Sequence, residues 1–297
     1  MSKPRSALRD AVEYWLIRFL LATLAIGPRA FSELLARAYT ELLDFAVPRL
    51  RAVALRNLQM ALPHADHDRI VDEMYRSIAR LLVAVARFPQ ITRGNIGGWI
   101  RYEGYEHFER ALARGKGVLF ATAHLGNWEL SAFAHAWMSA PMHIVVRPLD
   151  NPRLNAFAAA RRALSGNRLI EKQDYARAIL AALDRNEAVG VLLDQNASLD
   201  TGVFVDFFGI RACASAGFAR IAAHSGAAVI PGFALWSGQE RRYVLRFYAP
   251  IEMTGDVARD TQAIHAHLEG VIREHPGQWL WIHRRWKTRP PGEPPLY

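Results

Sequence analysis

From about residue 100 onward, short apolar runs alternate with helical stretches, and this alternation restricts the fold more than any other feature. Such runs, rich in Val, Ile, Leu and Phe, are typical of buried strands. Strands separated by helices belong to α/β domains, whose successive strands lie mostly parallel. The sequence therefore predicts an α/β fold with a mixed, largely parallel sheet flanked by helices. The expected strands are Val118–Ala123, Met142–Val146, Ala188–Leu193, Ala227–Pro231 and Tyr243–Phe247, and the expected helices are Asn151–Leu164, Asp174–Asp184, Ser215–His224 and Asp256–Glu274.

The first 95 residues lack such runs and are predicted to be helical. Ser32–Ala46 and Asp68–Phe88 carry apolar residues at helical spacing, and prolines separate the segments. We therefore divide the chain into an N-terminal helical region, residues 1–95, and an α/β domain, residues 96–297.

Within the N-terminal region, Ala11–Gly27 is a long apolar segment. It is shorter than the ~20 apolar residues of a clean membrane-spanning helix, and Glu13 and Arg18 interrupt it. Trp15 among basic residues is typical of an interfacial anchor. The segment can span a bilayer, lie in its interface, or be a buried helix of a soluble protein. Because its flanks are basic and its apolar face is broad, we expect a membrane anchor at about residues 8–27.

The charge balance favours anionic partners. The chain has 37 Lys and Arg against 28 Asp and Glu, a formal net charge of +9. Such a surface suits nucleic acid, acidic lipid, phosphorylated substrates or an acidic carrier protein. Cys213 is the single cysteine, which excludes a disulfide framework and a cysteine-based zinc site.

His124 is the strongest candidate for a catalytic residue. It follows the expected strand Val118–Ala123, and open α/β sheets bind ligands at the carboxyl ends of their strands. A glycine–asparagine turn predicts a helix that begins near Trp128 and carries Glu129 in its first turn. A histidine oriented by a carboxylate is a general base for a hydroxyl proton. Since the chain offers no obvious nucleophile, we expect that hydroxyl to belong to a substrate, although the spacing also fits a structural histidine.

Further polar candidates lie at strand ends and in the next helix. Arg147 can hold a phosphate through two hydrogen bonds, or it can be an exposed turn residue. One of Arg161 and Arg162 can point into the site while the other is solvated. Asp194 ends the strand Ala188–Leu193 and can position a substrate hydroxyl or a basic side chain, or form a turn.

Two aromatic segments have more than one interpretation. Phe204–Gly209 can line an acyl-chain groove or belong to the core, and we expect core. His275–Arg289 interleaves tryptophan with arginine. It can stack on single-stranded nucleic acid, lie at a lipid surface, or form a final strand or loop with partly buried tryptophans. We expect the last of these.

Taken together, these pieces resemble a known family. His124-Leu-Gly-Asn-Trp-Glu129 is similar to the H-x4-D/E box of glycerolipid acyltransferases. The order of the other motifs resembles the branch of the lipid A biosynthesis lauroyl/myristoyl acyltransferases, and the resemblance covers nearly the whole chain. These other motifs are Arg56-Asn57-Leu58 with Pro63, Arg147-Pro148, Asn151-Pro152, Asp194-Gln195, Phe207-Phe208-Gly209 and Trp281–Pro290.

The resemblance implies transfer of a fatty acyl group to a hydroxyl of a lipid acceptor, with a lipid A precursor as the leading acceptor. It implies an acyl carrier protein thioester as donor, no metal or cofactor, and attachment to the cytoplasmic face of the inner membrane. Whether the donor is acyl carrier protein or coenzyme A stays open. His124 would be the base, and Glu129 would orient and stabilise it. Arg162 and Asp194 resemble functional residues of the branch, and Arg147 is a candidate for contact with an acceptor phosphate.

Two stretches depart from the family pattern. Arg211–Gly217 stands where many members are rich in threonine, and Asp194–Ser198 lacks the usual acidic and aromatic residues. Related branches acylate phosphoinositol mannosides and other lipids, so the acceptor stays open. The competing class is a nucleic-acid-binding protein, which the net charge and the Trp/Arg segment favour. The apolar N-terminal segment argues against it, so we expect no nucleic-acid partner.

Overall fold

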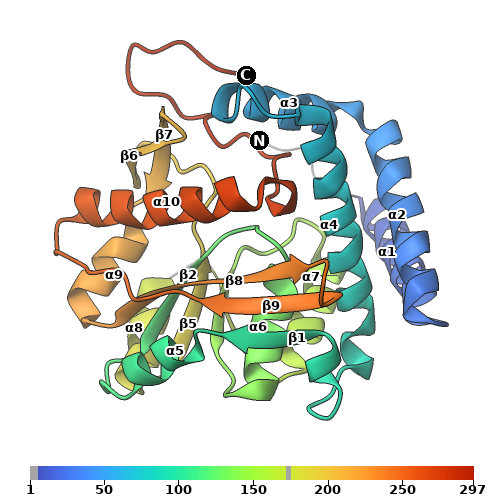
Figure 1. Ribbon diagram of the computed structural model, residues 1–297, viewed down its shortest axis with the longest axis horizontal. Helices are drawn as coiled ribbons and strands as arrows, with labels where there is room; N and C mark the ends of the chain where they lie inside the picture. Colours follow the sequence, from blue (N-terminus) through green and yellow to red (C-terminus); the bar gives the residue numbers. More distant parts are fainter. Residues whose placement is uncertain (1–5, 172–174) are drawn as a thin grey trace.

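The computed structural model has a seven-stranded sheet at its centre, and helices cover both faces of this sheet (Figure 1). The structure describes residues 6–171 and 175–297. The strands are β1 (Ile100–Glu103), β2 (Val118–Thr122), β3 (His143–Val146), β4 (Arg168–Glu171), β5 (Ala188–Leu192), β6 (Gly202–Phe207), β7 (Ile210–Ser215), β8 (Ala228–Ser237) and β9 (Arg242–Phe247).

The sheet is mixed and largely parallel, as predicted. Its order is β1-β9-β8-β2-β5-β3-β4. β8 and β9 pair antiparallel, and the other neighbouring strands of this sheet pair parallel. β6 and β7 form a separate antiparallel hairpin. The predicted strands are all present, but the fourth was predicted too short. We ended it at Pro231, whereas β8 continues through this proline to Ser237 and pairs with β9 along the way.

In the described residues, four α-helices precede the sheet, five lie between strands and one follows the last strand. They are α1 (Ala7–Ala25), α2 (Arg29–Ala46), α3 (Pro48–Ala61), α4 (His67–Arg87), α5 (Tyr105–Leu112), α6 (Trp128–Met138), α7 (Pro152–Ala163), α8 (Tyr175–Asp184), α9 (Gly217–Ser225) and α10 (Val257–Glu274). The predicted helices agree with these to within a few residues, and Asp174, the predicted start of one, lies outside the described residues. The structure also contains β1, β4, α5 and the β6–β7 hairpin, which the sequence did not predict. β1 and β4 are short edge strands with partly exposed residues, so they lack the apolar run of a central strand.

Both faces of β2 are buried, which explains its continuous apolar sequence. Val118 and Phe120 pack in the core with α5 and α6. Leu119 and Ala121 pack on the opposite face, in the core that includes residues of α8, α9 and α10. Residues of α3 and α4 belong to this second core, so the N-terminal helices and the sheet share apolar interior across residue 95.

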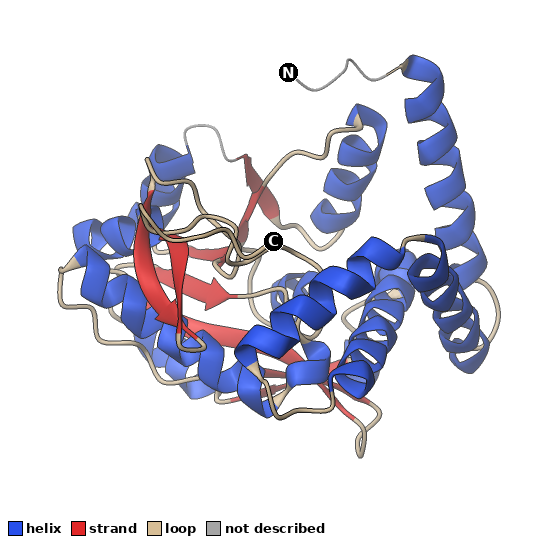
Figure 2. Cartoon of the chain, turned by 90° about the horizontal axis from the view of Figure 1, so that it is seen from above, coloured by secondary structure: helices blue, strands red, loops and turns tan. Residues whose placement is uncertain are grey.

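The first helix is docked on the rest of the chain, at the margin of the molecule (Figure 2). Leu21 and Leu24 of α1 are buried against α2 and α4. The buried guanidinium of Arg87 donates to the carbonyls of Leu24 and Gly27 at 3.1 and 2.7 Å. Asn151 Nδ2, at the start of α7, donates to the carbonyl of Asp10 at 3.0 Å. Among the helices in the described part of the chain, none has both the length and the apolarity needed to cross a bilayer.

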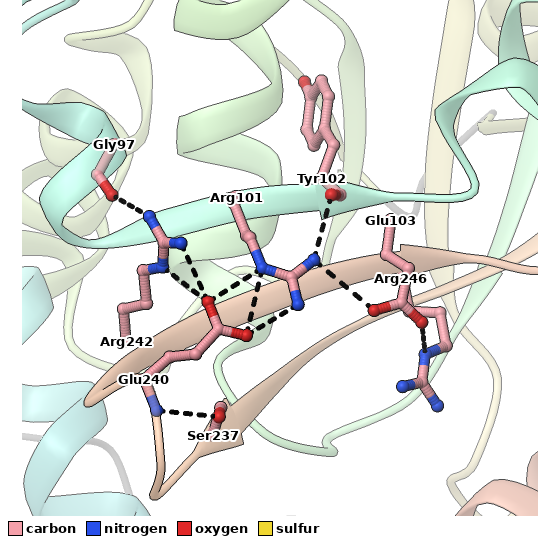
Figure 3. A network of polar contacts seen from close by, with 8 residues as sticks. All are labelled: Gly97, Arg101, Tyr102, Glu103, Ser237, Glu240, Arg242 and Arg246. Atoms are coloured by element: carbon pink, nitrogen blue, oxygen red, sulfur yellow. Dashed lines mark hydrogen bonds and ion pairs between the residues drawn. The ribbon is translucent and has the colours of Figure 1, made fainter.

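An ion-pair network fastens the edge strand β1 to the β8–β9 hairpin (Figure 3). Arg101 binds Glu240 at 2.6 Å and Glu103 at 3.4 Å. Arg242 also binds Glu240, and Arg246 also binds Glu103. Single exposed ion pairs contribute little, but linked ones hold their members in place, and charge along an edge strand discourages pairing with other chains.

Candidate active site

The parallel pairing of β2 and β5 brings His124 and Asp194 together. Thr122 pairs with Leu192, and each site residue lies two positions beyond its member of this pair. The backbone N–H of Leu193 donates to the carbonyl of Thr122 at 2.9 Å, which extends the alignment. Both side chains therefore leave the sheet at the carboxyl ends of adjacent strands, where α/β proteins form their sites.

Asp194 holds His124 through two hydrogen bonds. His124 Nδ1 lies 2.9 Å from Asp194 Oδ1, and the backbone N–H of His124 donates to Oδ2 at 3.0 Å. An ionised carboxylate only accepts hydrogen bonds, so we assign the imidazole proton to Nδ1. That tautomer leaves Nε2 free to accept a proton, and Nε2 makes no hydrogen bond to any described residue. The His124 side chain is 16% exposed, whereas Asp194 is completely buried.

The surroundings keep Asp194 ionised and favour a charged His124. Burial opposes the carboxylate, but the charge and hydrogen bond of His124, the charge of His283 and the hydrogen bond from Trp279 hold the pKa of Asp194 well below its usual range. Burial also opposes the imidazolium. The charge and hydrogen bond of Asp194, followed by the charge of Glu129, outweigh it and raise the pKa of His124. The pair is therefore suited to take up a proton.

Glu129 does not form the hydrogen bond that we expected of it. It lies in the first turn of α6, as predicted, but its carboxylate binds Arg162 through two hydrogen bonds, from Nε at 2.9 Å and from Nη2 at 2.5 Å. Both oxygens face the guanidinium, so Asp194 orients the imidazole and Glu129 acts on it through charge. This ion pair also joins α6 to the last turn of α7 and raises the pKa of Arg162.

The other predicted arginines lie apart from the His124–Asp194 pair. Arg147 is exposed just after β3, and no hydrogen bond joins it to the pair within the described residues. Arg161 is not simply solvated, because its Nη1 donates to the carbonyls of Val85 and Ala86 at the end of α4, both at 2.9 Å. Of the two adjacent arginines, Arg162 is therefore the one that contacts Glu129 beside the His124–Asp194 pair.

The loop that carries His124 is held against β8. Gly126 has φ +64°, and a Cβ atom there would lie 2.0 Å from the carbonyl oxygen of Ala234. The next residue, Asn127, donates its backbone N–H to this same oxygen at 2.9 Å. Its side chain accepts from the N–H of Leu130 at 3.0 Å and so caps α6. This close approach fixes the position of the loop after His124 and the start of α6.

The segment from 275 to 289 forms the back of the site, a position that the sequence did not predict. Trp279 Nε1 donates to Asp194 Oδ2 at 2.8 Å, and His283 Nε2 lies 3.2 Å from the Asp194 carbonyl oxygen. Buried Asn57 donates to the carbonyls of Trp281 and His283 at 2.7 and 2.8 Å. In the sequence, the one indication of this contact between Asn57 and the segment was that both belong to motifs of the family that the chain resembles.

The aromatic residues of this region belong to the core. Trp279, Trp281 and Trp286 are completely buried, more so than predicted, and cannot stack on nucleic acid bases. Phe207 and Phe208 are buried too, with ring centres 5.9 and 6.3 Å from Trp279, which confirms the expectation of core for these two residues. Phe204, the third phenylalanine of the segment, is only partly buried. Among the described residues, no three His, Cys, Asp or Glu side chains are grouped as metal ligands.

The fold and the site together define an α/β protein with a histidine held by a buried aspartate at the carboxyl end of its sheet. The family model for bacterial lipid A biosynthesis acyltransferases matches residues 1–288. The chain therefore belongs to this family, and it is a lipid acyltransferase.

Three of its relatives match 75–96% of the chain at low identity. A lipid A biosynthesis palmitoleoyltransferase of Escherichia coli is 27% identical over 96% of this chain and 95% of its own. A lipid A biosynthesis acyltransferase of Haemophilus influenzae is 24% identical over 94% of this chain and 89% of its own. A phosphatidylinositol mannoside acyltransferase of Mycobacterium tuberculosis is 27% identical over 75% of this chain and 72% of its own.

The close approach at Gly126 can be tested against a matched glycine. Gly115 has φ +69° but open space around its Cβ position, so Gly115→Ala introduces the same backbone strain without a clash. We expect Gly126→Ala to lower the free energy of unfolding by roughly 1–3 kcal/mol more than Gly115→Ala does. Urea unfolding of both variants measures this difference. Equal unfolding midpoints would show that the loop can move away from β8.

Proposed function

We propose that this lipid acyltransferase moves a fatty acyl group from an acyl carrier protein thioester to a hydroxyl of a lipid A precursor, with His124 as general base. The hydrogen bond from His124 Nδ1 to buried Asp194 is the observation that carries this proposal, because it leaves Nε2 for the acceptor hydroxyl. The relatives named for lipid A biosynthesis favour this acceptor. Another glycolipid or phospholipid is the alternative, which the relative named for phosphatidylinositol mannoside favours.

In the proposed reaction, His124 first accepts a proton from the acceptor hydroxyl and then donates it to the leaving thiolate. Nε2 of His124 takes the hydroxyl proton as the acceptor oxygen attacks the thioester carbonyl carbon. The carbon–sulfur bond then breaks, and the leaving thiolate takes the proton from the imidazolium. An ester and a free thiol result, so the atoms balance between the two substrates. The charge of Asp194 stabilises the transient imidazolium, and it acts strongly because the carboxylate is fully buried.

The other site residues have supporting roles in this proposal. The Glu129–Arg162 ion pair uses Nε and Nη2 of the arginine, which leaves Nη1 for an anionic group of the acceptor. Arg147, exposed after β3, is the second candidate for such a contact. The net charge of +9 suits an acidic carrier protein as donor. A coenzyme A thioester is the alternative donor.

Substitution of the pair tests the chemistry. We expect His124→Ala to lower turnover about 10²–10⁴-fold, because the general base is lost. Asp194→Asn should also slow the reaction and should move the acid limb of the pH–rate profile to lower pH. The base works when neutral, so this limb follows the pKa of His124. Asp194 raises that pKa, whereas burial lowers it. Without the charge of Asp194, the pKa of His124 therefore falls.

The pH profile of purified protein measures this shift, and Asp184→Asn is the control. Asp184 is an exposed carboxylate of α8, so its variant loses the same charge away from the site. A folded His124→Ala variant with near-normal turnover would contradict the assignment of the base. An acid limb that stays in place in Asp194→Asn would show that Asp194 does not act on His124.

Product analysis tests the substrates. Purified protein is given acyl carrier protein and coenzyme A thioesters in separate reactions, each with a lipid A precursor and with phospholipid or glycolipid acceptors. We expect mass spectrometry to find an added acyl group on the lipid A precursor, with acyl carrier protein as the better donor. Acylation of a phospholipid alone would assign a different acceptor to the same site.

We also propose that the protein attaches to the cytoplasmic face of the inner membrane through α1. One face of this helix is exposed although it is apolar, while Leu21 and Leu24 on the opposite side are buried. Exposed apolar faces of this kind mark interaction surfaces, and basic flanks suit anionic lipid. The exposed residues are Leu8, Val12, Trp15, Leu16 and Phe19.

A charged residue on this face should weaken membrane binding. Phe19 is 64% exposed, so Phe19→Glu leaves the core intact and replaces an apolar contact by a charge that lipid excludes. We expect its affinity for phosphatidylcholine–phosphatidylglycerol vesicles to fall about 10-fold or more, since burying such a side chain contributes roughly 1.5–3 kcal/mol. Leu199→Glu, at a residue that is 58% exposed elsewhere, is the control. Equal sedimentation of both variants with vesicles would contradict attachment through α1.

A further inference from the structure

Two arginines on neighbouring helices face the same phenylalanine ring. The guanidinium carbons of Arg18 in α1 and Arg161 in α7 lie 5.9 and 5.0 Å from the centre of the Phe157 ring. Tyr14 packs edge-on against this ring at 6.3 Å, and its hydroxyl accepts a hydrogen bond from Arg18 Nη1 at 3.0 Å. Arg18, Phe157 and Arg161 therefore define a cationic seam between α1 and α7, which we call the α1–α7 seam.

No carboxylate balances these two charges within the two helices. α7 contains no Asp or Glu, and α1 contains none after Glu13, which binds Arg9 and Asn151. Burial, and then the charge of Arg18, lower the pKa of Arg161. Two like charges that act on each other favour an anion beside them, because it relieves their repulsion.

Both guanidinium groups retain donors for such an anion. Arg161 uses Nη1 for the carbonyls of Val85 and Ala86, and Arg18 uses Nη1 for Tyr14. Within the described residues, Nε and Nη2 of both arginines make no hydrogen bond. Planar guanidinium donors of this kind match the geometry of phosphate oxygens.

The position of Arg18 indicates where the anion comes from. Arg18 lies at the edge of the exposed apolar face of α1, next to Trp15 and Phe19. If that face contacts a bilayer, an arginine at its edge reaches the level of the lipid phosphates. Arg162, one position further along α7, faces Glu129 and the active site instead. The seam therefore faces the bilayer rather than the acceptor hydroxyl.

We propose that the α1–α7 seam binds the phosphate of an anionic membrane lipid that remains in the bilayer while the acceptor reacts. This proposal rests on the membrane attachment proposed above. It adds a specific contact to that attachment, and it places α7, which carries Arg162, against the lipid surface.

Vesicle sedimentation of the full-length protein tests the seam. The vesicles are phosphatidylcholine alone, or phosphatidylcholine with roughly one part in five of phosphatidylglycerol. A basic residue near an anionic surface contributes about fivefold to binding. We therefore expect Arg18→Gln to weaken binding to the anionic vesicles about fivefold, and the double variant with Arg161→Gln to weaken it roughly 20-fold. Arg220→Gln, at an exposed arginine of α9, removes the same charge elsewhere and should change binding less than about twofold.

Each outcome decides between the proposals. If the wild-type protein binds neither kind of vesicle, membrane attachment and the seam both fail. If it binds the anionic vesicles and Arg18→Gln matches Arg220→Gln, the seam alone fails. Arg18 is exposed, so its single variant stays informative even if loss of Arg161, which caps α4, unfolds the double variant. A raised Michaelis constant for detergent-dispersed acceptor, with vesicle binding unchanged, would assign the arginines to the acceptor and overturn the proposal.

Discussion

The site depends on the buried carboxylate of Asp194, which stays ionised only while its hydrogen-bond partners surround it. Asp194 is removed from water, and an ionised group in such a place is stable only when hydrogen bonds and opposite charge replace its hydration. Its partners come from two distant parts of the chain, the loop after β2 with His124 and the C-terminal segment with Trp279. The end of β5, the end of β2 and the C-terminal segment therefore have to be placed together, and each of them limits how far the others can move.

Helix α7 connects this site to the surface that we propose meets the membrane. Adjacent residues on a helix point about 100° apart, so Arg161 and Arg162 serve different neighbours. Arg162 binds Glu129 in α6, whereas Arg161 binds the end of α4 and lies with Arg18 at the α1–α7 seam. α1 is thus an integral part of the fold, docked on α4 and α7, rather than a detachable anchor.

The departures from the family pattern fall on parts that contact the C-terminal segment. Arg211–Gly217 covers β7, where the backbone carbonyl of Cys213, not its side chain, accepts from buried Arg285 at 2.7 Å. A different side chain at this position keeps that hydrogen bond. In the other stretch, Asn196 is one of the residues that differ from the family pattern. Its Nδ2 donates to Thr288 Oγ1, and its Oδ1 accepts from the backbone N–H of Thr288, both at 2.9 Å. Both stretches therefore retain a local anchor although their sequences differ from the usual pattern.

The sequence by itself determined the local structure and the position of His124 at a strand end. Apolar runs and turn residues placed β2, the start of α6 and His124 at a strand end, because these depend on neighbours along the chain. It did not determine which carboxylate orients the imidazole. Glu129 is near in sequence, but Asp194 reaches Nδ1 because the parallel register of β2 and β5 aligns residues 70 positions apart. The complete burial of Trp279 was decided in the same way, by contacts between distant segments that only the tertiary structure brings together.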